Sequence, residues 1–218
     1  ASVSRALALC FDVQPLDPRW ERKGSADRGP WAMLEVIVAN RSLTRAEIRP
    51  ARTTVDAVHV PLAALADWWV RSFSAIANEE SARSYPTDTD LVRCLSAWND
   101  ADPPRGVSEE VWEDARFEWY QRHFWLSGAE GAWVPDLAFV RSEDELWVSW
   151  GAPSFLDARA PRFLEPPGVV AVAWSKASDA VEGLVAHVAE AVVAAGVDSS
   201  YAWSRGAPPR LVADPSSV

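Results

Sequence analysis

Apolar and polar residues alternate along the first part of the chain with the period of two that is typical of half-buried β-strands. Residues 6–13 place Leu7, Leu9 and Phe11 on one side, residues 31–38 are rich in Val, Ile and large side chains, and residues 52–60 follow as a third strand. A polar, proline-containing segment and the turn sequence Asn40-Arg41-Ser42 separate these strands. The front of the chain is therefore predicted to be a β meander.

Helical spacing of apolar residues follows, over residues 61–78, 109–126 and 179–195, with a short helix over 91–98. Pro61 suits a helix start, and Ser108 is a good N-cap for the second long helix. Trp68 should lie at the edge of the core. The residues predicted to face the core are Leu62, Leu65, Trp69, Phe73 and Ile76 in the first helix, and Val181, Leu184, Val185, Val188 and Val192 in the last.

The helix over 109–126 is apolar around more of its circumference than a surface helix requires. One side carries Val111, Trp112, Ala115, Trp119, His123 and Leu126, and another carries Phe117, Tyr120 and Phe124. This helix is either central in the fold or keeps one face for a partner. In the second case at least one of Phe117, Tyr120 and Phe124 is exposed in the isolated chain.

Two further apolar strands, over residues 133–140 and 145–150, flank the polar residues 141–144 and predict a hairpin. A last strand is predicted over 169–174. The whole pattern predicts an α+β fold in which a mixed or antiparallel sheet is covered by the three long helices. We expect a single domain over residues 1–200, with a sub-boundary near 151–168, and a tail or linker over 201–218.

Composition favours recognition over chemistry. Thirteen of the 218 residues are Trp, a residue that concentrates in cores and interface hot spots. The net charge of −10, without a basic run, argues against nucleic acid unless scattered arginines such as Arg19, Arg22, Arg28, Arg41 and Arg45 cluster in space. No apolar run is long enough for a membrane span, and a cytoplasmic protein with Cys10 and Cys94 as buried free thiols is expected.

Candidate chemistry is sparse. His59, His123 and His187 are dispersed without metal-binding spacing, so no metal and no cofactor are expected. His187 should be solvated, whereas His123, one turn after Trp119, is interpreted as a core histidine with both ring nitrogens hydrogen-bonded.

The segment Pro135-Asp136 followed by Glu145-Leu146-Trp147 resembles the two-carboxylate pattern of PD-(D/E)xK nucleases, in which a hairpin holds Mg²⁺. Trp147 occupies the position of the catalytic lysine. Asp136 and Glu145 are therefore kept as catalytic candidates only for an alternative interpretation as a divergent nuclease. A second alternative is a module in which aromatic faces stack on a ligand.

Four segments resemble an uncharacterised bacterial domain that accompanies ImmA/IrrE-type metallopeptidases, as neighbour or fusion, in phage-defence and stress-response settings. They are Pro61 to Trp69, Arg122-His123, Pro135-Asp136-Leu137 and Val148-Ser149-Trp150. The resemblance implies a sensor or adaptor domain beside an effector. The H-E-x-x-H of the peptidase itself is missing, so no protease activity carries over.

These observations together predict a non-catalytic, regulatory protein-recognition domain of a bacterial cytoplasmic system, such as phage defence or stress response. The expected partner is another protein or a downstream effector domain. The residues expected to contact it are Trp68, Trp112, Phe117, Trp119, Tyr120, His123 and Phe124.

Overall fold

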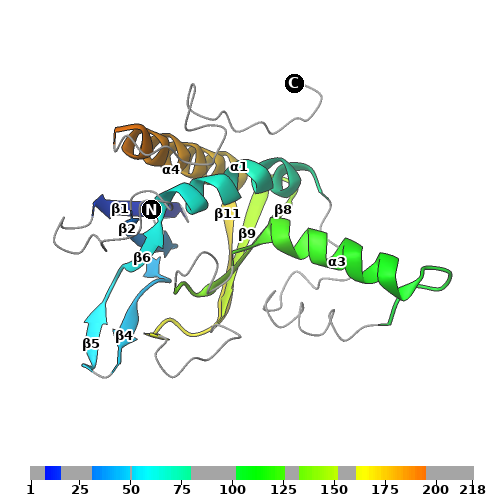
Figure 1. Ribbon diagram of the computed structural model, residues 1–218, viewed down its shortest axis with the longest axis horizontal. Helices are drawn as coiled ribbons and strands as arrows, with labels where there is room; N and C mark the ends of the chain where they lie inside the picture. The colour runs from blue at the N-terminus through cyan, green and yellow to red at the C-terminus, as the bar shows by residue number, and fades with distance from the viewer. Residues whose placement is uncertain are drawn as a thin grey trace, which may run out of the picture.

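The computed structural model describes residues 8–15, 31–49, 51–79, 102–125, 133–151 and 161–194. Within these ranges the chain forms helices and antiparallel sheets (Figure 1), so the prediction of an α+β fold is confirmed. The predicted short helix over 91–98, Cys94, Leu126 and the tail over 201–218 lie outside the described residues.

The first sheet is built around β2 (Trp31–Val38), whose side chains alternate between half-buried and buried along its whole length. β1 (Leu9–Pro15) pairs with one edge of β2 along seven residues. β3 (Arg41–Ser42) and β6 (Val58–Pro61) pair with the opposite edge of β2, β6 with its first residues and β3 with its last. The predicted meander is therefore present, but the expected strand over 52–60 is interrupted at Asp56 and Ala57.

A small second sheet contains β4 (Ala46–Ile48), β5 (Thr53–Val55) and β10 (Arg162–Phe163), with β4 in the middle. The turn between β4 and β5 contains Arg52 at a φ of 52°. In Figure 1 the β4 and β5 arrows extend away from the rest of the protein at the lower left. β4 and β10 were not predicted, because so short a run has no readable period, whereas β5 is the first part of the strand expected over 52–60.

The third sheet has the order β11, β9, β8, β7. β8 (Asp136–Ser142) and β9 (Glu145–Gly151) form the predicted hairpin, with Glu143 in the turn at a φ of 53°. β11 (Gly168–Ala173) pairs with β9 and agrees with the strand predicted over 169–174. β7 (Phe124–Trp125) pairs with β8 on the edge opposite β9.

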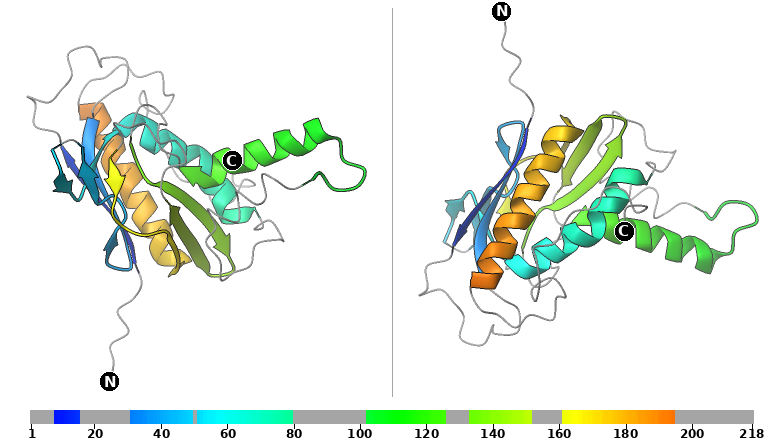
Figure 2. Two further views of the ribbon diagram at one scale, coloured as in Figure 1. Left: turned by 90° about the horizontal axis from the view of Figure 1, so that it is seen from below. Right: turned by 90° about the horizontal axis from the view of Figure 1, so that it is seen from above.

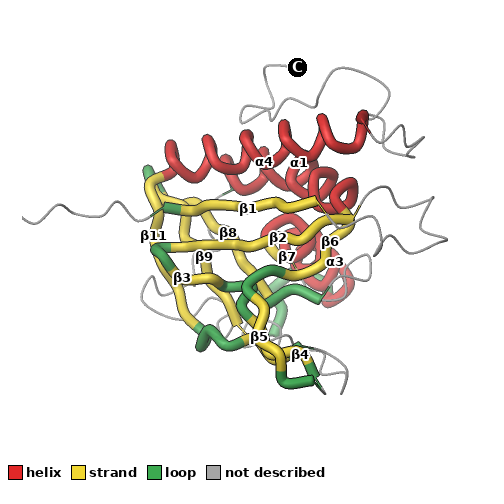
Figure 3. The backbone as a smooth tube through the Cα atoms, turned by 90° about the vertical axis from the view of Figure 1, so that its left-hand side faces the viewer, coloured by secondary structure: helices red, strands yellow, loops and turns green. Residues whose placement is uncertain are grey.

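Two helices, α1 (Leu62–Asn78) and α4 (Trp174–Ala194), pack against each other beside the strands, as Figure 3 shows. α1 begins directly after Pro61, and α4 begins five residues before the predicted start. The core is formed by the inner faces of these helices and of the first and third sheets. All of the residues predicted to face the core are buried: Leu62, Leu65, Trp69, Phe73, Ile76, Val181, Leu184, Val185, Val188 and Val192.

The third helix, α3 (Glu109–His123), does not cover a sheet as predicted. In Figures 1 and 2 it extends away from the strands, and only its C-terminal end reaches the third sheet. Ser108 caps it, because the Ser108 hydroxyl accepts a hydrogen bond from the amide of Val111. It ends at His123, three residues earlier than predicted, where the chain enters β7.

Cys10 is exposed, so the prediction of a buried thiol is wrong at this position. The alternation of β1 explains the difference. Leu9 is buried and Phe11 is half-buried on one side of the strand, so the intervening Cys10 must face the opposite side.

Gly168 provides a test of close packing within the third sheet. A Cβ atom at this position would lie 2.7 Å from Cζ2 of Trp150, its partner across the β11 and β9 pair. Gly168→Ala should therefore lower the free energy of unfolding by about 1 to 3 kcal/mol, the usual cost of overpacking. Chemical denaturation measures this change. Gly183→Ala is the matched control, since it meets open space in α4 and should stabilise by about 0.5 to 1 kcal/mol. Equal effects of both substitutions would contradict the expectation.

Candidate functional site

The C-terminal end of α3 is anchored by aromatic packing against the third sheet. Trp119 and Phe124 are buried with Ala138 and Val140 in a small cluster, and Tyr120 packs against it. Trp119 also stacks on His123, with ring centroids 4.3 Å apart and ring planes 18° apart. Residues four apart lie on the same face of a helix, which allows this ring contact. These side chains attach one end of α3 to the body of the protein.

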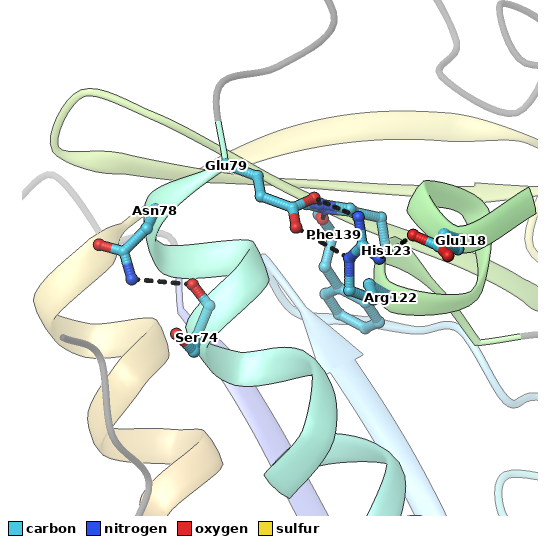
Figure 4. Close-up of polar contacts among 7 residues, drawn as sticks. All are labelled: Ser74, Asn78, Glu79, Glu118, Arg122, His123 and Phe139. Carbon is cyan, nitrogen blue, oxygen red and sulfur yellow. Dashed lines mark hydrogen bonds and ion pairs between the residues drawn. The ribbon is translucent and has the colours of Figure 1, made fainter. Parts of the chain in front are cut away.

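His123 has no exposed surface and bonds to two other elements (Figure 4). Its Nδ1 lies 2.8 Å from the carbonyl oxygen of Phe139 in β8, and its Nε2 lies 3.2 Å from Oε2 of Glu79, directly after α1. A carbonyl oxygen can only accept, so Nδ1 donates the hydrogen in the first bond, and Nε2 donates to the Glu79 carboxylate only when the ring is protonated. The interpretation of His123 as a core histidine engaged through both nitrogens is confirmed.

Glu79 joins the ends of α1 and α3. Its carboxylate forms an ion pair with Arg122, at 2.8 Å between Nε of Arg122 and Oε1. Arg122 also approaches Glu118 one turn earlier, at 3.5 Å. Trp68 of α1 adds a further connection, because its Nε1 donates to the carbonyl oxygen of Gln121 at 3.0 Å. The last turn of α3 is therefore held by α1 as well as by the third sheet.

Burial lowers the pKa of His123 below its ordinary value of 6.5. The positive charge of Arg122 acts in the same direction, while the Phe139 carbonyl and the Glu79 carboxylate favour the charged ring and reduce the shift. The pKa of Tyr120 is raised above 10.0, mainly by burial and further by the negative charge of Asp136. The lowered pKa of His123 and the raised pKa of Tyr120 both favour the uncharged side chain.

The lowered pKa of His123 predicts a loss of stability in mild acid. The unfolded chain binds a proton at this residue from about pH 6.5 downward, whereas the folded chain keeps the ring neutral to lower pH. The stabilising contribution is therefore complete above about pH 6.5 and decreases as the pH falls below that value. Denaturation at a series of pH values from 7 to 5 should show this decrease in the wild type and a smaller one in His123→Gln. An unchanged slope in the variant would contradict the assignment.

The outer part of α3 differs sharply from its anchored end. Phe117 is 62% exposed and Val111 is 60% exposed. Trp112 is half-buried, with the Arg116 guanidinium 5.7 Å above its ring. The prediction that at least one of Phe117, Tyr120 and Phe124 is exposed is confirmed by Phe117. Val111 and Ala115, which sequence reasoning placed on the same side as Trp119, are both exposed, because the helix extends beyond the sheet that would have covered them.

The structure divides the expected contact residues into internal, half-buried and exposed ones, and Trp112 is among the half-buried ones. Trp119, His123 and Phe124 are internal and hold α3 in place, which corrects their assignment as contact residues. Trp68 and Tyr120 are half-buried and engaged within the chain, Trp68 with Gln121 and Tyr120 in a stack on Phe124 at 4.5 Å. Phe117 is the member of the set with the largest exposed side chain, and Val111 joins it although it was not expected to do so.

The alternative catalytic pair does not form a site. Asp136 pairs with Gly151, whereas Glu145 pairs with Ser142 at the other end of the same β8 and β9 ladder. Six residues of strand separate these ends by roughly 20 Å at about 3.3 Å per residue. Because Mg²⁺ needs its ligands at about 2 Å, Asp136 and Glu145 cannot share one ion, and this two-carboxylate interpretation is corrected. No group of three or more His, Cys, Asp or Glu side chains within the described ranges is arranged to hold a metal ion.

The aromatic side chains near α3 use their ring faces within the protein. Tyr120 stacks on Phe124 with planes 14° apart, and Trp119 stacks on His123. These two stacks occupy one face of each of the four rings. Their role here is internal packing.

Comparisons of the chain with protein-family models, curated proteins and solved structures find no match. None of the helices that the structure describes is long and apolar enough to cross a bilayer.

Proposed function

We propose that this chain is a non-catalytic recognition domain that binds another protein through the exposed side of α3. The observation that supports the proposal most directly is the exposure of Phe117 and Val111 on a helix that extends away from the fold. Large apolar side chains that stay exposed on a projecting helix are a mark of protein interaction sites. The anchored end of α3 supplies rigidity, which reduces the entropy lost when a partner binds.

The arrangement of α3 separates its two tasks along the helix. Trp119, His123 and Phe124, at its C-terminal end, are buried and make the anchoring contacts. Val111 and Phe117 lie before this end and are exposed, and Phe117 shares its side of the helix with Glu113 and Asp114. A partner can therefore cover the outer part of α3 while the anchored end stays packed.

The setting we propose is a bacterial cytoplasmic system in which this domain acts as sensor, adaptor or regulatory subunit for an effector. The resemblance to the domain that accompanies ImmA/IrrE-type metallopeptidases supports this assignment, and it favours phage defence or stress response. The Trp-rich composition is consistent with a recognition role.

Photo-crosslinking in the native host tests the proposal. The full chain would carry p-benzoylphenylalanine in place of Phe117, and a matched chain would carry it in place of Val193, which is 57% exposed on α4. We expect a discrete protein adduct from position 117 that is lost on Val111→Asp and is competed by the unlabelled chain. Absence of an adduct, or the same adducts from position 193, would contradict the proposal.

Phe117→Asp should separate binding from folding. Because Phe117 is mostly exposed, the free energy of unfolding should change by no more than about 0.5 kcal/mol. Affinity for the crosslinked partner should fall at least about tenfold, as expected for an aromatic contact at the centre of an interface. Denaturation and direct binding measurements check the two parts. Val193→Asp is the control and should affect neither, and an unchanged affinity of Phe117→Asp would show that α3 is not the contact surface.

A further inference from the structure

The described part of the chain carries its exposed apolar side chains on two projections of opposite charge. Six large hydrophobic residues are exposed. Val107, Val111 and Phe117 belong to α3 and the residues just before it, and Ile48 and Leu164 belong to the small sheet of β4, β5 and β10. Only Val193 lies elsewhere. In Figures 1 and 2 these two projections lie on opposite sides of the protein.

The exposed side of α3 is acidic. The helix contains five carboxylates and two arginines. Glu110, Glu113 and Asp114 precede Phe117 by seven, four and three residues, so they share its side of the helix. The two arginines are already engaged, Arg116 over the Trp112 ring and Arg122 with Glu79. The apolar surface of α3 is therefore bordered by negative charge.

The small sheet carries Arg49 and Arg52 at its turn and Arg162 opposite Glu47, so its outer end is basic although the whole chain has a net charge of −10. Arg49, Arg52 and Arg162 are exposed, and within the described ranges their side chains form no ion pair or hydrogen bond. We call these three residues with Ile48 the arginine tip, whereas Leu164 lies toward the other end of β4, where its amide donates to the carbonyl oxygen of Arg45. Arginines that the sequence singled out behave differently, because Arg41 pairs with Glu165 at 2.9 Å and Arg45 pairs with Asp56 at 3.4 Å.

The two projections have complementary charges. Guanidinium groups bind carboxylates through paired hydrogen bonds, and the apolar side chains beside them can be buried in the same contact. The two surfaces differ from one another, so a contact between them is heterologous and links copies head to tail. Because they lie on opposite sides of one chain, a single copy cannot satisfy its own pair of surfaces.

We propose that the arginine tip of one copy binds the acidic, Phe117-bearing side of α3 of a second copy. The inference rests on the proposed function, because it takes α3 as the recognition surface. The molecule that binds this surface is another copy of the same chain. The contact is repeated from copy to copy, so assembly grows with concentration. Its strength should be modest, since small charged interfaces are at the weak end of specific association.

Sedimentation velocity of the purified full chain tests this proposal. At concentrations from about 10 to 500 µM, where weak association is measurable, the average mass should rise above that of one chain. Arg49→Glu/Arg52→Glu and Glu113→Arg/Asp114→Arg should each remain monomeric. Glu182→Arg/Glu190→Arg is the matched control for the helix variant, because it makes the same change of charge at exposed positions of α4 and should assemble like the wild type.

Mixing supplies the decisive comparison. In each variant the tip and the helix have charge of the same sign, so neither variant should assemble alone, whereas an equimolar mixture of the tip variant and the helix variant should assemble, because every tip then meets a helix of opposite charge. A chain with both pairs of substitutions should assemble again, because both signs are reversed. A wild type that stays monomeric throughout, or a mixture that does not assemble, would overturn the inference. If the chain is monomeric while position 117 crosslinks to a different protein, the second copy is excluded and the proposed function stands.

Discussion

Trp69→Ala is expected to lower the free energy of unfolding by about 3 to 5 kcal/mol, the usual range for removing a buried aromatic side chain. Trp69 is 1% exposed and lies where α1 meets both large sheets. Its ring contacts Phe11 of β1 at 5.9 Å and Phe139 of β8 at 4.8 Å between centroids, and Trp68 approaches it edge-on at 4.8 Å. Alanine would leave a cavity that these three rings cannot fill without moving away from their other contacts.

Chemical denaturation measures the effect, and two comparisons make it specific. Trp69→Phe should cost less than alanine, because it keeps a ring and removes an indole N–H that is buried without a hydrogen-bond partner in the described part of the chain. Phe117→Ala should change stability by no more than about 0.5 kcal/mol. A small effect of Trp69→Ala would mean that the two sheets are not joined through this residue.

The elements with long periodic patterns were predictable from the sequence. The inner faces of α1 and α4 repeat apolar residues over four or more turns, and the β8 and β9 hairpin alternates around a polar turn, so local pattern determines each of them. β3, β7 and β10 have two residues each and are defined by their partners, which the linear sequence does not show. The position of α3 was not predictable for the same reason, since packing of its last turn places the whole helix.

The candidate site, too, was predictable from the sequence only in part. A helix apolar on two sides suggested that one of its aromatic residues is exposed, and Phe117 is the residue that the structure exposes. The contact of His123 with Glu79 joins residues 44 apart, and no spacing in the sequence indicates it. Cys10 could have been placed correctly, because the alternation of its strand already assigned it to the side opposite Leu9. The arginine tip depends on β10 pairing with β4 and is visible only in three dimensions.

His123→Ala is expected to lower the free energy of unfolding by about 2 to 4 kcal/mol and to loosen α3 more than any other element. The substitution removes a fully buried ring, leaves the Phe139 carbonyl without its donor, and exposes one face of Trp119. His187→Ala is the matched control, since His187 is exposed on α4 and should contribute no more than about 0.5 kcal/mol.

Hydrogen exchange distinguishes loss of the anchor from general destabilisation. In His123→Ala the amides of α3 should exchange much faster, while those of α1 and α4 should change only as far as global stability has changed. Partner binding through position 117 should weaken even though Phe117 itself is unaltered, because a helix released at its C-terminal end must be ordered again on binding. If α3 exchanges as slowly in His123→Ala as in the wild type, the helix is held by contacts other than its last turn, and the rigidity on which the recognition surface depends has another source.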